Sequence, residues 1–167
     1  MDPRLAPIAE IYDLNTDLLL NCLEGVSDVH AAERVVPGTN SLAFIAAHLI
    51  DARHNIANFL GRPLPNPLET TLGGVERIED APALPAVREV RGMWLAVSSH
   101  LRDCLEGASA DLLAAPSPVA LPVGDPSLLG GIAFLAEHES FHVGQLAFLR
   151  KALGYPAMSF TRPPPGP

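Results

Sequence analysis

Apolar residues recur at spacings of three and four along four stretches of the chain, and none of these stretches contains a proline. The proline-free windows are residues 8–36, 38–62, 86–115 and 127–155, and all 17 prolines lie outside them. Proline inside a helix costs about 3 kcal/mol, and the apolar spacing is that of one helix face. The pattern therefore predicts four helices, at residues 5–24, 40–60, 85–106 and 127–153.

Glycines and capping residues mark the ends of these helices. A glycine follows each apolar run, at Gly25, Gly61, Gly107 and Gly154. Glycine adopts the left-handed conformation that often ends a helix. The candidate N-caps are Thr39, Asn40 or Ser41 for the second helix, and Asp125 or Ser127 for the fourth.

The predicted fold is an all-α four-helix bundle with long connections after the second and third helices. The connections are residues 61–83 and 107–126, both rich in proline or glycine. Connections of this length do not force consecutive helices to be antiparallel neighbours, so a crossover is expected. We predict a single domain over residues 1–161, followed by a disordered proline-rich tail at 162–167.

Composition narrows the classes of partner. The 167 residues carry 11 Lys and Arg against 19 Asp and Glu, a net charge of −8. Such a surface repels nucleic acids and anionic membranes, and no apolar stretch reaches the roughly 20 residues of a membrane span. Two cysteines, Cys22 and Cys104, are too few for a disulfide framework and favour a cytoplasmic protein with buried, inert thiols.

Three of the six histidines fall on apolar helix faces. His138 and His142 are four residues apart on the fourth helix, and His48 lies on the second. His54 and His100 are expected to point away from the core. A divalent ion bound by three imidazoles would satisfy their nitrogens and keep one position open. The alternative is that each inward histidine only forms hydrogen bonds within the core.

Other chemical motifs are incomplete. Glu139 and His142 form a single Glu-x-x-His, whereas di-iron bundles need two of these and a glutamate from each of two further helices. No glycine-rich phosphate loop, nucleophile elbow or Cys-x-x-Cys pair is present. Haem ligation by histidine is possible in a bundle, but no feature favours it. The single tryptophan, Trp94, has the spacing of a core residue.

Two segments resemble the DinB/YfiT-like superfamily of four-helix bundles. Residues 138–146 (HESFHVGQL), followed by 149–154 (LRKALG), are similar to its fourth-helix signature. Residues 40–49 (NSLAFIAAHL) are similar to the segment that carries the third metal ligand. The resemblance implies that His48, His138 and His142 bind one nickel or zinc ion. It also implies a homodimer, and thiol-dependent S-transferase or related activity.

Two further residues are candidates beside the ligands. Glu139 could be a fourth ligand or a general base, or it could lie at a solvated rim of the site. Gln145, close to one turn after His142, could orient a ligand or simply lie on the helix surface.

The leading hypothesis is a metal-dependent enzyme acting on a small molecule, either as a transferase using a low-molecular-weight thiol or as a hydrolase. The alternative is a non-catalytic dimeric bundle whose metal is structural or adventitious. An open ligand position facing a cleft would favour the enzyme.

Overall fold

Four long helices make up most of the chain, as the apolar pattern predicts. The structure is a computed structural model that describes residues 1–72 and 84–161. The long helices are α1 (Ala6–Leu23), α3 (Leu42–Phe59), α5 (Val87–Gly107) and α7 (Leu128–Ala152). Their ends lie within three residues of the predicted ones. The described residues contain no strand, so the all-α fold class is confirmed.

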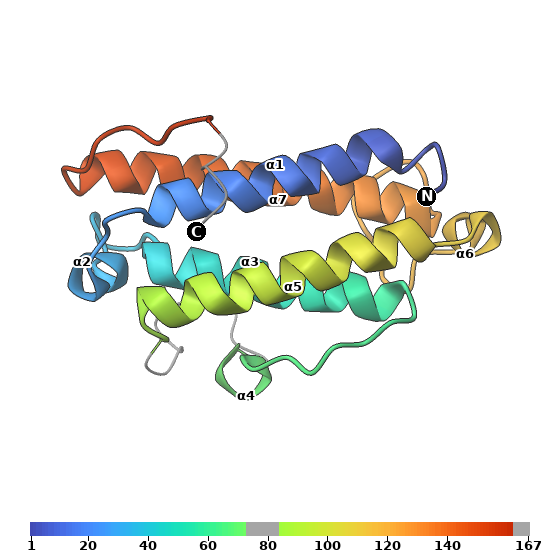
Figure 1. The fold of residues 1–167 in the computed structure, drawn as a ribbon, viewed down its shortest axis with the longest axis horizontal. Coiled ribbons are helices and arrows are strands. Elements are labelled where there is room, and N and C mark those ends of the chain that lie inside the picture. The colour runs from blue at the N-terminus through green and yellow to red at the C-terminus, as the bar shows by residue number, and fades with distance from the viewer. Residues whose placement is uncertain (73–83, 162–167) are drawn as a thin grey trace, which may run out of the picture.

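The four helices form a bundle in which α1 and α3 each pack against both α5 and α7. Figure 1 shows that α3 and α5 run in the same direction, and that α1 and α7 run together in the opposite direction. The connection between α3 and α5 is therefore a crossover along the bundle, as its length suggests. The expected tail at 162–167 and part of this crossover (73–83) lie outside the described residues.

Serine caps and glycines set most helix ends. The side chain of Ser41 accepts a hydrogen bond from the amide of Phe44 at the start of α3, and Ser127 caps α7 in the same way. Gly25, Gly61 and Gly154 have φ values of 70°, 72° and 87°. The expectation for Gly107 is wrong, because α5 includes this residue and its φ is not positive.

Three short helices, α2 (Asp28–Ala32), α4 (Glu69–Leu72) and α6 (Ala110–Ala114), were not predicted. They lie in the connections and are too short to show an apolar period. The segment containing α4 covers the outer face of α3. Leu68 and Leu72 are buried there, and the side-chain amide of Asn66 donates to the carboxylate of Asp51 at 2.6 Å.

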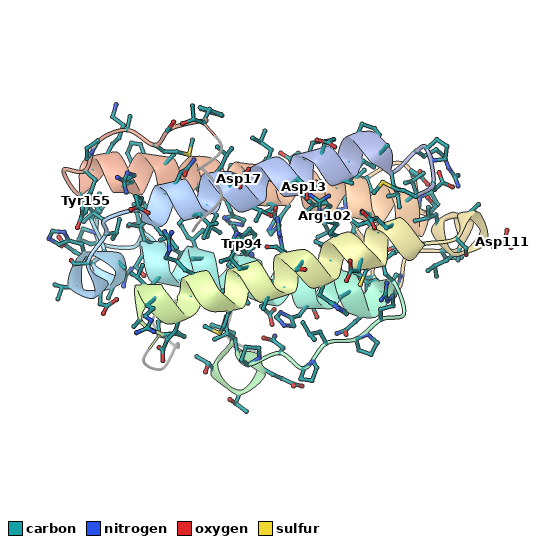
Figure 2. All side chains as sticks on the ribbon, in the orientation of Figure 1. Asp13, Asp17, Trp94, Arg102, Asp111 and Tyr155 are labelled. Carbon is teal, nitrogen blue, oxygen red and sulfur yellow. The ribbon has the colours of Figure 1, made fainter. Side chains whose placement is uncertain are left out.

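A polar layer that contains Arg53 and Glu139 divides the apolar core of the bundle into two clusters. One cluster contains Trp94 and the apolar residues around it, which confirms Trp94 as a core residue. The second surrounds Leu101 and Ile132. Trp94 points toward α1 and its Nε1 donates to the carbonyl of Thr16 at 3.1 Å. Figure 2 also shows Asp13 and Arg102, whose ion pair joins α1 to α5 at the bundle surface.

No helix among the described residues combines the length and the apolar character needed to cross a membrane.

Candidate metal centre

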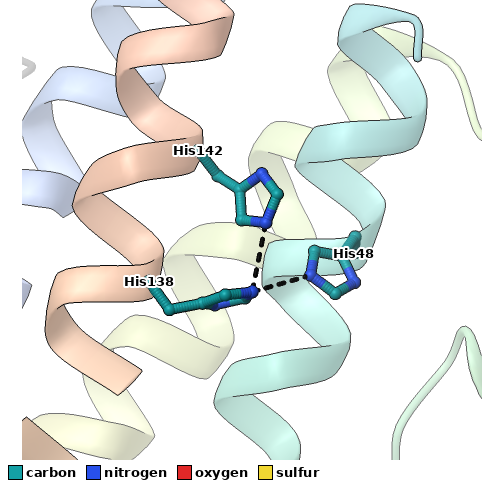
Figure 3. A group of neighbouring side chains, drawn as sticks. All are labelled: His48, His138 and His142. Carbon is teal, nitrogen blue, oxygen red and sulfur yellow. Dashed lines mark hydrogen bonds between the residues drawn. The ribbon is translucent and has the colours of Figure 1, made fainter. Parts of the chain in front are cut away.

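Three imidazoles converge between α3 and α7. His48 projects from α3, and His138 and His142 project from successive turns of α7, which runs antiparallel to α3 beside it (Figures 1 and 3). The Nε2 atom of His138 lies 3.1 Å from that of His142 and 3.4 Å from that of His48. The structure thus brings together all three histidines that the sequence places on inward faces.

These separations match those expected for a shared metal ion. Imidazole nitrogens lie about 2.0–2.1 Å from zinc, so two ligands of a tetrahedral site are roughly 3.3–3.4 Å apart. One ligand atom from each of His48, His138 and His142 lies within 4.8 Å of the others. In the described part of the chain, these are the residues that could together hold an ion. In the metal-free protein two facing Nε2 atoms form a hydrogen bond only where one of them carries a proton, whereas a divalent cation accepts a lone pair from all three.

Gln145 fixes the tautomer of His142. The Oε1 atom of Gln145 lies 2.7 Å from Nδ1 of His142. An amide oxygen only accepts hydrogen bonds, so Nδ1 of His142 donates and its Nε2 keeps a lone pair toward the other imidazoles. Gln145 is therefore placed to orient this ring, as the sequence suggested for one of its two possible roles.

Burial favours the neutral form of His48 and His138. The pKa of His48 falls from 6.5 to about 4, chiefly through burial and then through the charges of His142 and His138. Burial also lowers the pKa of His138, whose Nδ1 is buried without a hydrogen-bond partner among the described residues. Neutral imidazoles are the form that binds metals.

The metal-free protein should therefore lose stability in mild acid. In the unfolded chain His48 takes up its proton near pH 6.5, but in the folded chain only near pH 4. Between these values the unfolded state binds more protons, so the free energy of unfolding falls as the pH decreases. Urea titrations in a chelator at several pH values would measure this. The His48→Gln variant should show a smaller decrease, and equal slopes for both proteins would contradict the prediction.

Glu139 takes neither of the two positions expected for it from the sequence. It is buried, so its assignment to a solvated rim is wrong. Its Oε1 and Oε2 atoms accept hydrogen bonds from Nη2 and Nε of Arg53, at 2.7 and 2.8 Å. Both oxygens are thereby engaged by Arg53, and Glu139 is not part of the group of potential metal ligands in the described residues.

Arg53 is a buried polar residue of the core that sequence reasoning missed. Besides Glu139 of α7, its guanidinium donates to the carbonyl of Tyr12 and the hydroxyl of Thr16, both in α1. Its central carbon lies 3.7 Å from the ring centroid of Trp94 in α5. This single side chain of α3 contacts the other three long helices. The sequence did contain a signal for this role, because Arg53 lies on the inward, largely apolar face of its helix.

The remaining histidines lie apart from this group. His100 bonds to the carbonyl of Arg62 and His30 to the hydroxyl of Tyr155. His54, which was expected to point away from the core, is nevertheless buried: it is 3% exposed and its Nδ1 bonds to the carbonyl of Ile50. The segment between α3 and α4 covers the outer face of α3, where sequence periodicity predicts solvent.

Both cysteines are buried and unpaired, as expected. Burial raises the pKa of Cys22 to about 12 and also raises the pKa of Cys104. A thiol with a raised pKa is a poor nucleophile at neutral pH. The cysteines are therefore packing residues of the core.

Comparison with known proteins agrees with this arrangement. A search of curated proteins finds no match. The family description of the DinB superfamily, in contrast, matches residues 11–146. The match runs from α1 into α7 and includes all three converging histidines. Since it covers most of the chain, this protein belongs to the DinB superfamily.

Proposed function

We propose that this protein is a metal-dependent enzyme whose divalent ion, nickel or zinc, is held by His48, His138 and His142. The observation that carries the proposal is the convergence of three Nε2 atoms at separations of 3.1 and 3.4 Å. A DinB superfamily member with such a group is compatible with metal-dependent catalysis. The ion itself and the reaction are part of the proposal.

The donor set favours a catalytic ion over a structural one. Structural zinc sites are usually closed by four protein ligands, whereas catalytic sites have three and keep one position open. Glu139 lies between His138 and His142 in the sequence, and both of its carboxylate oxygens accept hydrogen bonds from Arg53. Because Arg53 occupies this carboxylate, the three imidazoles have no fourth protein ligand among the described residues. A non-catalytic bundle with a structural metal is therefore the weaker alternative.

The favoured reaction is transfer from or to a low-molecular-weight thiol. A divalent ion at this site would act as a Lewis acid that lowers the pKa of a thiol or of water. The residues of this chain hold the ligands in place: Gln145 fixes the tautomer of His142, and burial keeps His48 neutral. Hydrolysis is the second candidate, because three neutral ligands leave the full positive charge of the ion to polarise a water molecule.

Cobalt substitution would test the thiol hypothesis. Cobalt(II) reports its ligands through its visible and near-ultraviolet absorption, so addition of a small thiol such as 2-mercaptoethanol should produce a sulfur-to-cobalt charge-transfer band. The band should be absent in His142→Ala. A site that binds cobalt but shows no spectral change at millimolar thiol would contradict a thiol substrate and leave hydrolysis as the better candidate.

We also propose that the protein forms a homodimer. The family resemblance implies it, and large apolar side chains of α1, Ile11 and Leu14, are 40% and 43% exposed. Light scattering at micromolar concentration should give twice the chain mass of 17.7 kDa. A monomer under these conditions would contradict the proposal.

A further inference from the structure

A cleft of about 580 Å³ lies along the N-terminal half of α3 and the C-terminal half of α7. Its volume is in the range of small-molecule sites, about 300–1,000 Å³. Six of the lining residues matter for the argument: Asn40, Ile45, Phe141, Gly144, Gln145 and Phe148. The cleft is therefore large enough for a substrate rather than for water alone.

The cleft adjoins the three imidazoles through residues next to them, although none of the three histidines lines it. Ile45 lies three residues before His48 on α3, and Phe141 directly precedes His142 on α7. Gln145 belongs to both sites, because it lines the cleft while its Oε1 accepts the hydrogen bond from His142. A molecule in the cleft would thus contact Gln145 and Phe141, both of which touch His142: the ring centroids of Phe141 and His142 are 5.5 Å apart.

The lining has the character of a site for an uncharged apolar molecule. None of the described residues that line the cleft is charged. Phe141 and Phe148 are 58% and 70% exposed, although phenylalanine is normally buried. Their exposure on one wall provides aromatic surface for stacking, and the side chains of Asn40 and Gln145 provide a few hydrogen-bonding groups.

Gly144 keeps the cleft open. It lies within the 25-residue helix α7, where glycine costs about 1 kcal/mol relative to alanine. A Cβ atom at this position would meet no atom within 4 Å, so helix packing does not require glycine here. A larger side chain would instead project into the cleft that Gly144 lines.

We propose that this cleft binds the second substrate of the enzyme, an uncharged small molecule with an aromatic or similarly flat apolar group. The inference rests on the proposed function, because it places this substrate beside the metal-bound reactant. It adds what the metal centre alone does not provide, namely the chemical class of the molecule that reacts there. Charged substrates would be disfavoured, since none of the described lining residues neutralises them.

The test uses N-phenyl-1-naphthylamine, an uncharged aromatic probe whose fluorescence rises in apolar surroundings. The full chain should bind it with one site per chain, with and without metal. Phe148→Ser and Gly144→Leu should each weaken binding by about tenfold or more, the first by removing a stacking surface and the second by filling the cleft. Gly144→Leu should not unfold the protein, since leucine favours helix.

Matched controls are available elsewhere in the chain. Phe160 is 72% exposed and lies outside the cleft, so Phe160→Ser should bind the probe like the wild type. Gly92 lies within α5, and a Cβ atom added there would also meet nothing within 4 Å, so Gly92→Leu is the control for Gly144→Leu.

Three outcomes would overturn the inference. They are absence of probe binding to the wild type, equal binding in the cleft variants and their controls, and conversion of a dimer to a monomer by Phe148→Ser with unchanged probe binding. The last would make the aromatic wall an interface between copies. Metal content is measured on the same samples. If metal is bound but the probe is not, the inference fails and the proposed function stands; if metal is absent, the proposed function fails first.

Discussion

Protein purified without a histidine tag should carry about one divalent ion per chain, and His142→Ala or His48→Ala should carry almost none. Each substitution removes one of three nitrogens that converge within 4.8 Å. Two remaining imidazoles hold a divalent ion poorly against water, so the loss of affinity should be several hundredfold or more. Elemental analysis after dialysis measures the metal content directly.

The control for this experiment is His100→Ala. His100 belongs to α5 and bonds to the carbonyl of Arg62, away from the three imidazoles, so metal content should not change. His54→Ala should retain metal too, but it is the poorer control because His54 is buried. The apoprotein should stay folded, since two apolar clusters stabilise the bundle without an ion. Stoichiometric metal in both His48→Ala and His142→Ala would contradict the proposed site.

Glu139→Ala should destabilise the protein by about 3–5 kcal/mol, the cost of leaving one member of a buried ion pair uncompensated. The side chains of Arg53 and Glu139 are 1% and 3% exposed. Without the carboxylate, the guanidinium keeps its charge in a water-poor core. Urea unfolding followed by the fluorescence of Trp94, whose ring lies 3.7 Å from the guanidinium carbon, would measure the effect.

Two further variants make this prediction specific. Asp13→Ala removes the same type of charge from the ion pair with Arg102, whose side chain is 51% exposed, and should cost less than about 1 kcal/mol. The double variant Arg53→Met, Glu139→Leu removes both buried charges and should be more stable than Glu139→Ala. Equal costs for Glu139→Ala and Asp13→Ala would contradict a large stabilising contribution from the buried pair.

The three converging histidines could be predicted from sequence because helix periodicity determines which side chains share a face. His138 and His142 are one turn apart, and His48 follows the apolar arc of its own helix, so no knowledge of tertiary packing was needed beyond the bundle itself. The four long helices were predictable for the same reason. Their boundaries depend on local signals, such as the serine caps at Ser41 and Ser127.

What the sequence did not predict depends on contacts between distant segments. His54 is buried by the connection that follows α3, and periodicity within one helix carries no information about such a cover. Glu139 lies near the edge of the apolar face, where a carboxylate is normally solvated. Its burial follows from Arg53, 86 residues earlier in the chain, which supplies a matching charge. The cleft next to Gln145 likewise involves the connection before α3 as well as two helices.

The polar layer around Arg53 has a consequence for how the bundle tolerates change over evolution. Helices faced with leucine and alanine can slide past one another by a turn and still bury apolar surface. A guanidinium that must meet a carboxylate, a carbonyl and a hydroxyl on other helices is satisfied in one longitudinal alignment only. Since His48 shares α3 with Arg53, and His138 is the neighbour of Glu139 on α7, that alignment also sets the donors opposite each other. We therefore expect the connections to accept insertions and deletions freely, while the interior keeps the register of the three converging imidazoles.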